Sequence, residues 1–278
     1  MSVVDFLEVA RGPAPLLVSI PHTGTEIPPE IEAGLVSPWL ARKDTDWWIE
    51  KLYDFAGGLG ATTVRTTISR TVIDVNRDPS GASLYPGRAT TGLCPTETFD
   101  GEPLYRPGRE PGEAEIAHRR RLYFDPYHAA VAAEIARLGK AHPRIALYDC
   151  HSIRSVVPRL FDGELPHMNI GTSSGASCDS ELQRQIEEVC AGSRFSWVAN
   201  GRFKGGWITR HYGRPEEGVH AVQMELACRS YSNEPITAVD KTDWPPAYDE
   251  EKAAEMRVTL QRLLKACLSF ARAGDRLK

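Results

Sequence analysis

Short runs of branched apolar residues alternate with amphipathic segments along the chain. Such runs predict strands at 15–20, 61–65, 71–75, 145–148, 196–199 and 219–225. Apolar positions recur at helical spacing, and so predict helices, at 45–56, 113–140, 179–190 and 250–271. We expect Asp44 or Asp46 to cap the first helix and Pro126 to kink or split the second. The alternation predicts an α/β fold with a mixed or mostly parallel sheet covered by helices on both faces.

Residues 79–112 interrupt this alternation. They contain repeated proline and glycine with few periodic apolar positions, which predicts a long irregular excursion. Tyr85, Leu93, Phe99 and Tyr105 favour an ordered flap over a disordered linker. Because no boundary separates the candidate functional residues before and after the excursion, we expect residues 1–278 to form a single domain.

Composition and charge narrow the class of protein. The 33 basic and 37 acidic side chains give a net charge of −4, which argues against a general nucleic-acid or anionic-membrane binder. An anionic small molecule would have to be bound by local cationic side chains. The first 15 residues lack the pattern of a secretory signal, and the six cysteines are widely spaced, as free thiols are. We expect a soluble, cytoplasmic protein; the sequence specifies no oligomeric state.

Polar residues that can carry chemistry stand at the ends of predicted strands. His22, Asn76-Arg77, His151 and Glu225 each follow or end one, where ligands gather in open α/β sheets. Two histidines and a carboxylate can hold zinc and leave one position open for water, as in catalytic sites. Glu225 ends an apolar strand, where a carboxylate is costly unless it is paired, bound to metal or solvated in a cleft.

Several arginines lie near these strand ends. A guanidinium can hold a substrate carboxylate through two parallel hydrogen bonds, and the candidates are Arg70, Arg77, Arg154 and Arg210. Each of them would serve equally well in a structural ion pair, although Arg77 is favoured by its position directly after the predicted strand at 71–75. The glycine-rich segment 201–213 predicts a pocket wall but matches no phosphate-binding loop.

Longer segments match one known family in order along nearly the whole chain. They are SIPHTGTEIP (19–28), DTDWWIEKLYDFA (44–56), SRTVIDVNRDP (69–79), LYPGRATTGLCP (84–95), FDGEPLY (99–105), DCHSIRS (149–155), LFDGELP (160–166), GRFKGGWITRHYG (201–213) and HAVQMEL (220–226). With these segments the sequence resembles the N-formylglutamate amidohydrolase (N-formylglutamate deformylase) family of histidine degradation.

The resemblance implies a fold and a role for several residues. The family is similar to zinc carboxypeptidases and aspartoacylase, which implies a zinc-carboxypeptidase-like (phosphorylase/hydrolase-like) mixed sheet between helices. His22 and His151 then correspond to metal ligands, Glu225 to the general base and acid, and Asn76-Arg77 to a pair that holds a substrate carboxylate.

One position departs from the related zinc enzymes. Their usual H-x-x-E would place glutamate at position 25, where this chain has Thr25. The third metal ligand must therefore come from elsewhere. We expect Asp46, with Asp44 and then Glu26 as the alternatives.

The resemblance implies hydrolysis of N-formyl-L-glutamate to formate and L-glutamate, the last step of a histidine degradation route. The expected cofactor is Zn²⁺ or another divalent transition metal, and the expected partner is a small anionic substrate, not nucleic acid or a membrane. One alternative is a zinc amidohydrolase that acts on another N-acyl amino acid or a small peptide. The other alternative is a non-catalytic protein that binds a small molecule.

Overall fold

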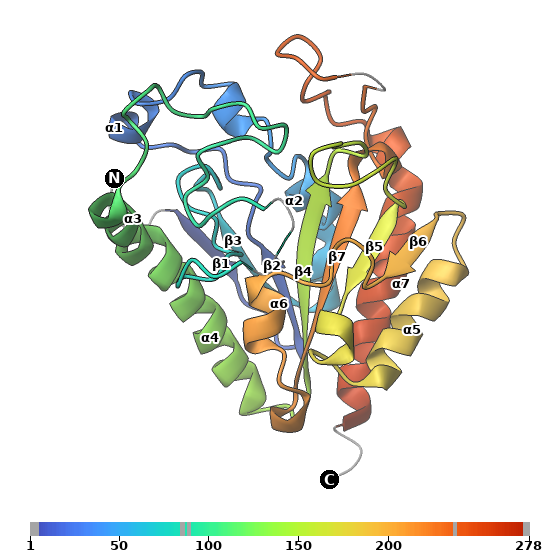
Figure 1. Ribbon diagram of the computed structural model, residues 1–278. Coiled ribbons are helices and arrows are strands. Elements are labelled where there is room, and N and C mark those ends of the chain that lie inside the picture. The colour runs from blue at the N-terminus through green and yellow to red at the C-terminus, as the bar shows by residue number, and fades with distance from the viewer. Residues whose placement is uncertain (1–5, 84–86, 88–89, 236–237, 275–278) are drawn as a thin grey trace.

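One mixed sheet of seven strands, in the order β1-β3-β2-β4-β7-β5-β6, organises the chain (Figure 1). The computed structural model describes residues 6–83, 87, 90–235 and 238–274. The strands are β1 (Leu7–Ala10), β2 (Leu16–Ile20), β3 (Thr62–Thr66), β4 (Ile145–Ile153), β5 (Met168–Gly171), β6 (Trp197–Ala199) and β7 (Val219–Ala227). Strands β3, β2, β4 and β7 run parallel, while β1 and β5 pair antiparallel with their neighbours β3 and β7. The predicted α/β fold with a mixed sheet is confirmed.

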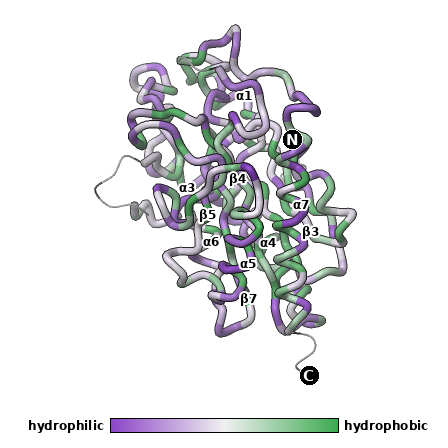
Figure 2. The backbone as a smooth tube through the Cα atoms, turned by 90° about the vertical axis from the view of Figure 1, so that its right-hand side faces the viewer, coloured by the Kyte–Doolittle hydropathy of each residue, from purple (hydrophilic) through white to green (hydrophobic). Residues whose placement is uncertain are grey.

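Helices cover both faces of the sheet. They are α1 (Pro29–Glu32), α2 (Ile49–Leu52), α3 (Glu113–Arg119), α4 (Asp125–Gly139), α5 (Ser180–Ala191), α6 (Trp207–Tyr212) and α7 (Glu250–Ala273). Helices α4 and α6 lie in front of the sheet in Figure 1, and α7 lies behind it. In Figure 2 hydrophobic positions recur along the strands and along the helices packed on them. Each face therefore has its own apolar core.

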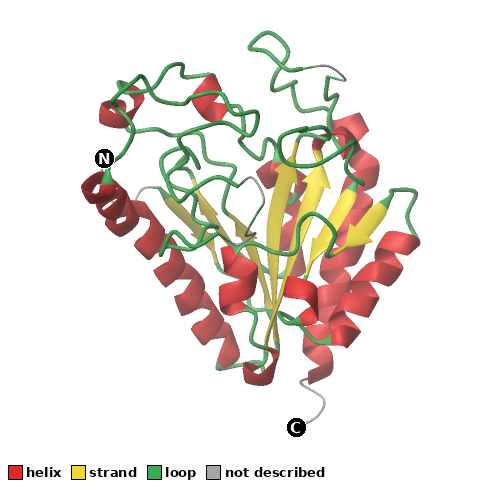
Figure 3. Cartoon of the chain, viewed as in Figure 1, coloured by secondary structure: helices red, strands yellow, loops and turns green. Residues whose placement is uncertain are grey.

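Successive side chains along each strand point to opposite faces of the sheet and so contribute alternately to the two cores. Val18 and Tyr148 belong to the core with α5 and α7, whereas Leu17 and Leu147 belong to the core with α4. On the α4 side the strands change character toward their carboxyl ends, where polar side chains replace apolar ones. Pairing of β2, β4 and β7 aligns Ser19 with Asp149 and Asp149 with Gln223, and then His151 with Glu225. The long loops of the molecule lie beyond these ends (Figure 3).

The predicted strand at 71–75 is wrong. This segment forms turns, in which the Val72 amide donates to Ser69 O and the Arg77 amide donates to Asp74 O. Val72, Ile73 and Val75 are nevertheless buried in the core on the α4 side. A short run of branched apolar residues reports burial, and it predicts a strand only where a neighbouring strand satisfies its backbone.

The predicted helix at 45–56 is much shorter in the structure. Trp48 has left-handed backbone angles (φ 68°, ψ 4°), which a continuous right-handed helix cannot contain, and α2 spans only Ile49–Leu52. A 3₁₀ segment follows at Asp54–Leu59. Neither Asp44 nor Asp46 caps α2, because the side chains of both accept hydrogen bonds from more distant segments.

Other segments were missed or mistaken in length. Strands β1 and β5 and helix α6 had no prediction, while β4 and β7 extend beyond their predicted ends. The helix around Pro126 continues through a π-helical turn at Arg120–Phe124. Within the excursion Leu93, Phe99 and Tyr105 are buried, whereas Tyr85 lies outside the described residues. No helix in the described ranges is long and apolar enough to span a bilayer.

Candidate active site

His22, Asp46 and His151 meet at the carboxyl end of the central strands. One potential ligand atom from each of these buried residues lies within 4.8 Å of the other two. His22 follows β2, His151 lies in β4, and Asp46 is held by its own amide, which donates to His22 O at 3.0 Å. The Nδ1 atoms of His22 and His151 lie 3.6 and 3.1 Å from Asp46 Oδ2. Two imidazoles and one carboxylate thus converge on a single point.

The outward nitrogen of each imidazole faces a carboxylate of its own. His22 Nε2 lies 2.7 Å from Asp74 Oδ1, and His151 Nε2 lies 2.9 Å from Asp149 Oδ2. For His22, donation from Nε2 leaves the lone pair of Nδ1 free to point at the centre of the cluster. His151 Nε2 also lies 2.9 Å from Asn76 Nδ2, and His151 Nδ1 faces Asp46 Oδ2. Within the described part of the chain, buried His22 Nδ1 has no hydrogen-bond partner. This arrangement is typical of histidines that bind a metal through Nδ1.

The cluster has strong internal electrostatics. Burial opposes ionisation of Asp46, but His22 and His151 outweigh burial and hold the pKa of Asp46 below its usual range. Burial likewise opposes the charged form of His151, yet Asp149 and Asp46 hold the pKa of His151 well above its usual range. A divalent cation would be favoured by the same carboxylates, and it would replace the proton on Nδ1.

Glu225 stands beside the cluster with few groups to stabilise its charge. Burial, which the nearby charge of His151 opposes, raises the pKa of Glu225 to about 7. Gln223 Nε2 donates to Glu225 Oε2 at 3.1 Å, and Gln223 Oε1 accepts the Gly206 amide at 2.7 Å. A carboxylate with this pKa can both accept and release a proton near neutral pH.

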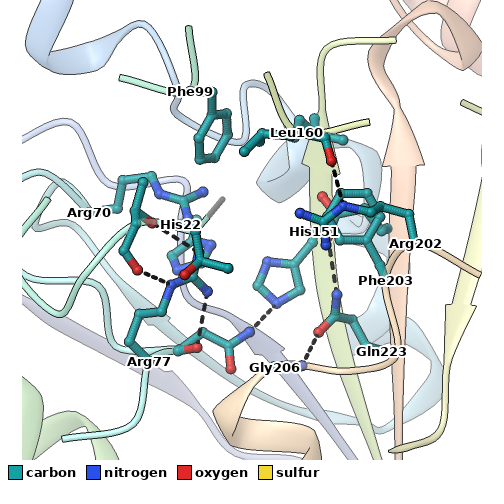
Figure 4. A pocket seen from close by; sticks show the side chains of 15 residues that line it. His22, Arg70, Arg77, Phe99, His151, Leu160, Arg202, Phe203, Gly206 and Gln223 are labelled. Carbon is teal, nitrogen blue, oxygen red and sulfur yellow. Dashed lines mark hydrogen bonds between the residues drawn. The ribbon is translucent and has the colours of Figure 1, made fainter. Parts of the chain in front are cut away.

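A cavity of about 60 Å³ opens directly onto these groups (Figure 4). It is lined by His22, Arg70, Asn76, Arg77, Thr90, Thr91, Phe99, His151, Ile153, Leu160, Arg202, Phe203, Gly206, Gln223 and Glu225. Asn76 is fixed here because its Oδ1 accepts the Ile208 amide at 2.8 Å and its Nδ2 donates to Asp149 Oδ2 at 3.2 Å. Segments that are far apart in the sequence therefore form one pocket with both polar and apolar lining residues.

Three arginines lie in the pocket wall. Arg70 and Arg77 come from one side and Arg202 from the other (Figure 4). Arg70 donates to Asp74 Oδ2 at 2.8 Å and to Asp46 Oδ1 at 3.3 Å, with its guanidinium 4.8 Å from the centre of the Phe99 ring. The pocket thus offers cationic groups on two sides of the histidine cluster.

The other predicted site residues lie outside this pocket. Arg154 pairs with Asp44 at 3.2 Å and with Asp100 at 2.8 Å, and it lines a separate cavity of about 610 Å³. Asp44 accepts the Phe99 amide at 2.6 Å, and Glu26 is exposed, so neither joins the histidine cluster. Arg210 lies in α6 and donates to Gly205 O at 2.9 Å.

Sequence reasoning did not single out Asp74, Gln223 or Arg202. Asp74 lies in a segment predicted as a strand, where a polar residue gives no sign of its partner 52 positions away. Gln223 could have been found, since it lies two residues before Glu225 and must share its face. Arg202 lies in the segment that was predicted to form a pocket wall.

The chain is similar in sequence to two curated relatives. A Pseudomonas aeruginosa protein named N-formylglutamate deformylase is 47% identical over 269 residues, which cover 96% of this chain and 98% of the relative. A protein of the same name from Pseudomonas putida is 44% identical over 265 residues, or 95% of this chain and 96% of the relative.

Solved structures share the fold. The crystal structure of an N-formylglutamate amidohydrolase from Ralstonia eutropha matches with a TM-score of 0.78 at 24% identity, over 98% of this chain and 100% of that chain. A gene product of Agrobacterium tumefaciens matches with a TM-score of 0.69 at 19% identity, over 95% of each chain. The family model for N-formylglutamate amidohydrolase matches residues 14–232. The chain therefore belongs to the N-formylglutamate amidohydrolase family.

Proposed function

We propose that this protein catalyses the metal-dependent hydrolysis of N-formyl-L-glutamate to formate and L-glutamate. The observation that supports it best is the position of Glu225 beside the His22–Asp46–His151 cluster, in the lining of a pocket that also contains arginines. The Pseudomonas relatives, which match nearly the whole chain, carry the name N-formylglutamate deformylase.

We assign His22, Asp46 and His151 as the ligands of Zn²⁺ or another divalent transition metal. The donor set of two imidazole nitrogens and one carboxylate oxygen suits zinc, and three protein ligands leave a position open. Among the described residues, the buried Nδ1 of His22 has no hydrogen-bond partner, which fits a role as a metal ligand. When bound, the metal would polarise the formyl carbonyl and lower the pKa of an attacking water.

Glu225 is the proposed proton carrier. Its carboxylate takes a proton from the attacking water as the new C–O bond forms, and it gives that proton to the departing amine nitrogen as the C–N bond breaks. Burial raises the pKa of Glu225, which eases release of the proton to the amine, while a bound cation would favour the ionised form that accepts the proton from water. The Gln223 amide holds Glu225 Oε2 in place through its 3.1 Å hydrogen bond.

The substrate has two carboxylates, and the pocket wall has arginines on two sides. We assign Asn76, Arg77 and Arg70 to one carboxylate and Arg202 to the other. Arg154 and Arg210 do not line this pocket, so the proposal leaves them without a direct contact to substrate.

The direct test is the release of formate from N-formyl-L-glutamate by the purified protein. We expect release by the metal-loaded protein, loss of release after chelation, and recovery when zinc is added back. Undiminished release by protein shown to be metal-free would contradict the metal role. No release by folded, zinc-loaded protein would contradict N-formyl-L-glutamate as the substrate. A panel of other N-acyl amino acids would then be tested.

We further propose that the reaction ends a histidine degradation route, as the family resemblance implies. Cells that lack this protein should then accumulate N-formylglutamate when histidine is supplied as a nitrogen source. Normal growth on histidine without such accumulation would contradict this role and leave the proposed chemistry unaffected.

A further inference from the structure

Asp74 contacts several polar groups in addition to the imidazole of His22. It is completely buried in the turn that follows Ile73. Its Oδ1 accepts from His22 Nε2 at 2.7 Å and from the Asn76 amide at 2.9 Å, while its Oδ2 accepts from Arg70 Nη2 at 2.8 Å. Arg77 Nη2 lies 3.7 Å from the same Oδ2. One carboxylate thus contacts the histidine cluster and the pocket wall together.

We propose that Asp74 is a positioning residue that fixes both a metal ligand, His22, and a substrate-binding guanidinium, Arg70, so that metal affinity and substrate affinity depend on the same carboxylate. This inference rests on the proposed function for the role of Arg70. It goes beyond that function because Asp74 itself would touch neither the metal nor the substrate.

Asp74 sets the tautomer of His22. An ionised carboxylate can only accept, so it selects the imidazole with a proton on Nε2 and a lone pair on Nδ1. That Nδ1 atom faces Asp46 Oδ2 at 3.6 Å and is the atom available to a cation. An asparagine at position 74 could present its NH₂ group to Nε2 and so place the proton on Nδ1. Loss of such an outer partner typically weakens metal binding about 10–100-fold.

Asp74 also sets the direction of the Arg70 guanidinium. Its guanidinium is buried between Asp74 Oδ2 and Asp46 Oδ1, at 2.8 and 3.3 Å. Without the Asp74 charge, the ion-pair partner left to Arg70 within the described part of the chain is Asp46, the proposed metal ligand. We expect the guanidinium to turn toward Asp46, away from the orientation that binds a substrate carboxylate.

Asp149 provides a matched comparison inside the same site. It is also completely buried, and its Oδ2 accepts from His151 Nε2 at 2.9 Å. Its other contacts are Ser19 Oγ at 2.8 Å and Asn76 Nδ2 at 3.2 Å, and no arginine in the described ranges pairs with it. Asp149 therefore supports a metal ligand as Asp74 does, but without the link to a guanidinium.

The experiment compares Asp74→Asn with Asp149→Asn in the full chain. Zinc affinity is measured by competition with a chromophoric chelator, and KM for N-formyl-L-glutamate is measured at saturating zinc. We expect both variants to bind zinc about 10–100-fold more weakly. Asp74→Asn should also raise KM through Arg70, by about tenfold or more, since a charged hydrogen bond is typically worth that much. Asp149→Asn loses a contact to Asn76 and none to Arg70, so any rise in KM there should be the same with and without Arg70. Asp74→Asn in an Arg70→Met background should raise KM no further.

Each half of the inference can fail separately. Unchanged zinc affinity in Asp74→Asn would overturn the role toward His22, and a KM that is unchanged in Asp74→Asn, or that rises as much in the Arg70→Met background, would overturn the role toward Arg70. If Asp74→Asn does not fold, Asp74→Glu replaces it, because glutamate keeps the charge and displaces the carboxylate. Failure of the proposed function would look different, because wild-type protein would then release no formate while the zinc competition still reported on His22.

Discussion

Two halves of one sheet face differ in residue type although they share the same strands. The apolar half, near the amino ends of β4 and β7, presents Leu147 and Ala221 to the core on the α4 side. The polar half, one step further along the same strands, presents Asp149 and Gln223, with Ser19 beside them on β2. The backbone register is continuous across both halves, so the change in chemistry comes from side chains alone.

This comparison shows how the fold separates stability from chemistry. Burying polar groups is costly unless they are hydrogen-bonded, and the polar half satisfies its groups mainly through one another. Ser19, Asn76 and His151 all donate to Asp149, for example. We therefore expect changes in the polar half to alter turnover and ligand affinity, and changes in the apolar half to alter the free energy of unfolding.

The largest effect is expected from Glu225→Gln in the polar half. Glutamine cannot carry the proton from water to the amine, so kcat should fall about 10³-fold, which corresponds to about 4 kcal/mol. Zinc affinity and thermal stability should stay close to wild type. Steady-state formate release, with zinc content measured in the same samples, checks this expectation. A variant with the wild-type rate would remove Glu225 from the reaction.

Glu50→Gln is a matched control for that variant. Burial also raises the pKa of Glu50, but Glu50 lies in α2, whose neighbour Ile49 packs in the core on the other side of the sheet. We expect its turnover to match wild type. Equal losses in the two variants would mean that removing the charge of a buried or half-buried glutamate lowers activity wherever it lies.

The next largest effect is expected from Leu147→Ala in the apolar half. Leu147 is 1% exposed, and truncation of such a side chain leaves a cavity that typically costs 2–5 kcal/mol. Denaturant unfolding measures this loss. At a temperature where the variant is fully folded, its KM and zinc affinity should equal those of the wild type. A folded variant with weakened zinc binding would show that the two halves are coupled through β4.

The apolar and polar halves of this sheet face explain which parts of the fold and the site could be predicted from the sequence. Strands β2, β4 and β7 were predictable because each contains a run of apolar residues, and His22, His151 and Glu225 stood out because they end such runs. Asp46 was preferred as the third ligand from the family pattern, and it is the carboxylate in the histidine cluster. The prediction that Asp46 caps a helix was wrong, because its hydrogen bonds to distant residues outweigh the local preference of aspartate for a helix start.

Residues whose roles depend on distant partners could not be predicted. The turn at 71–75 is as apolar as a strand, yet Asp74 N donates to Leu93 O, in the irregular excursion. Arg154 directly follows β4 and Arg77 directly follows a segment predicted as a strand, but Arg154 pairs with Asp44 and Asp100. Only the folded chain distinguishes a guanidinium that faces the pocket from one that is used in structural ion pairs.

A smaller effect, on selectivity, is expected from Arg202→Gln in the pocket wall. If Arg202 binds the side-chain carboxylate, its loss should lower kcat/KM for N-formyl-L-glutamate about 10–100-fold, as expected for a charged hydrogen bond of about 1.5–3 kcal/mol. N-formyl-L-glutamine lacks that carboxylate, so its much lower kcat/KM should change little. Arg77→Gln should lower both values. Equal losses on both substrates in Arg202→Gln would assign Arg202 to a group that the two substrates share.

The smallest effect is expected at the start of α5. Asp179 caps this helix by accepting the Glu181 amide at 2.8 Å, and α5 packs on the other side of the sheet through Leu182 and Ile186. Asp179→Ala should lower the free energy of unfolding by about 1 kcal/mol and leave formate release unchanged. Asp179→Asn keeps an acceptor at the cap, so it should recover most of that loss in denaturant unfolding. Reduced turnover in folded Asp179→Ala would mean that the helices behind the sheet also shape the pocket. Residues on that side of the sheet would then affect catalysis as well as stability.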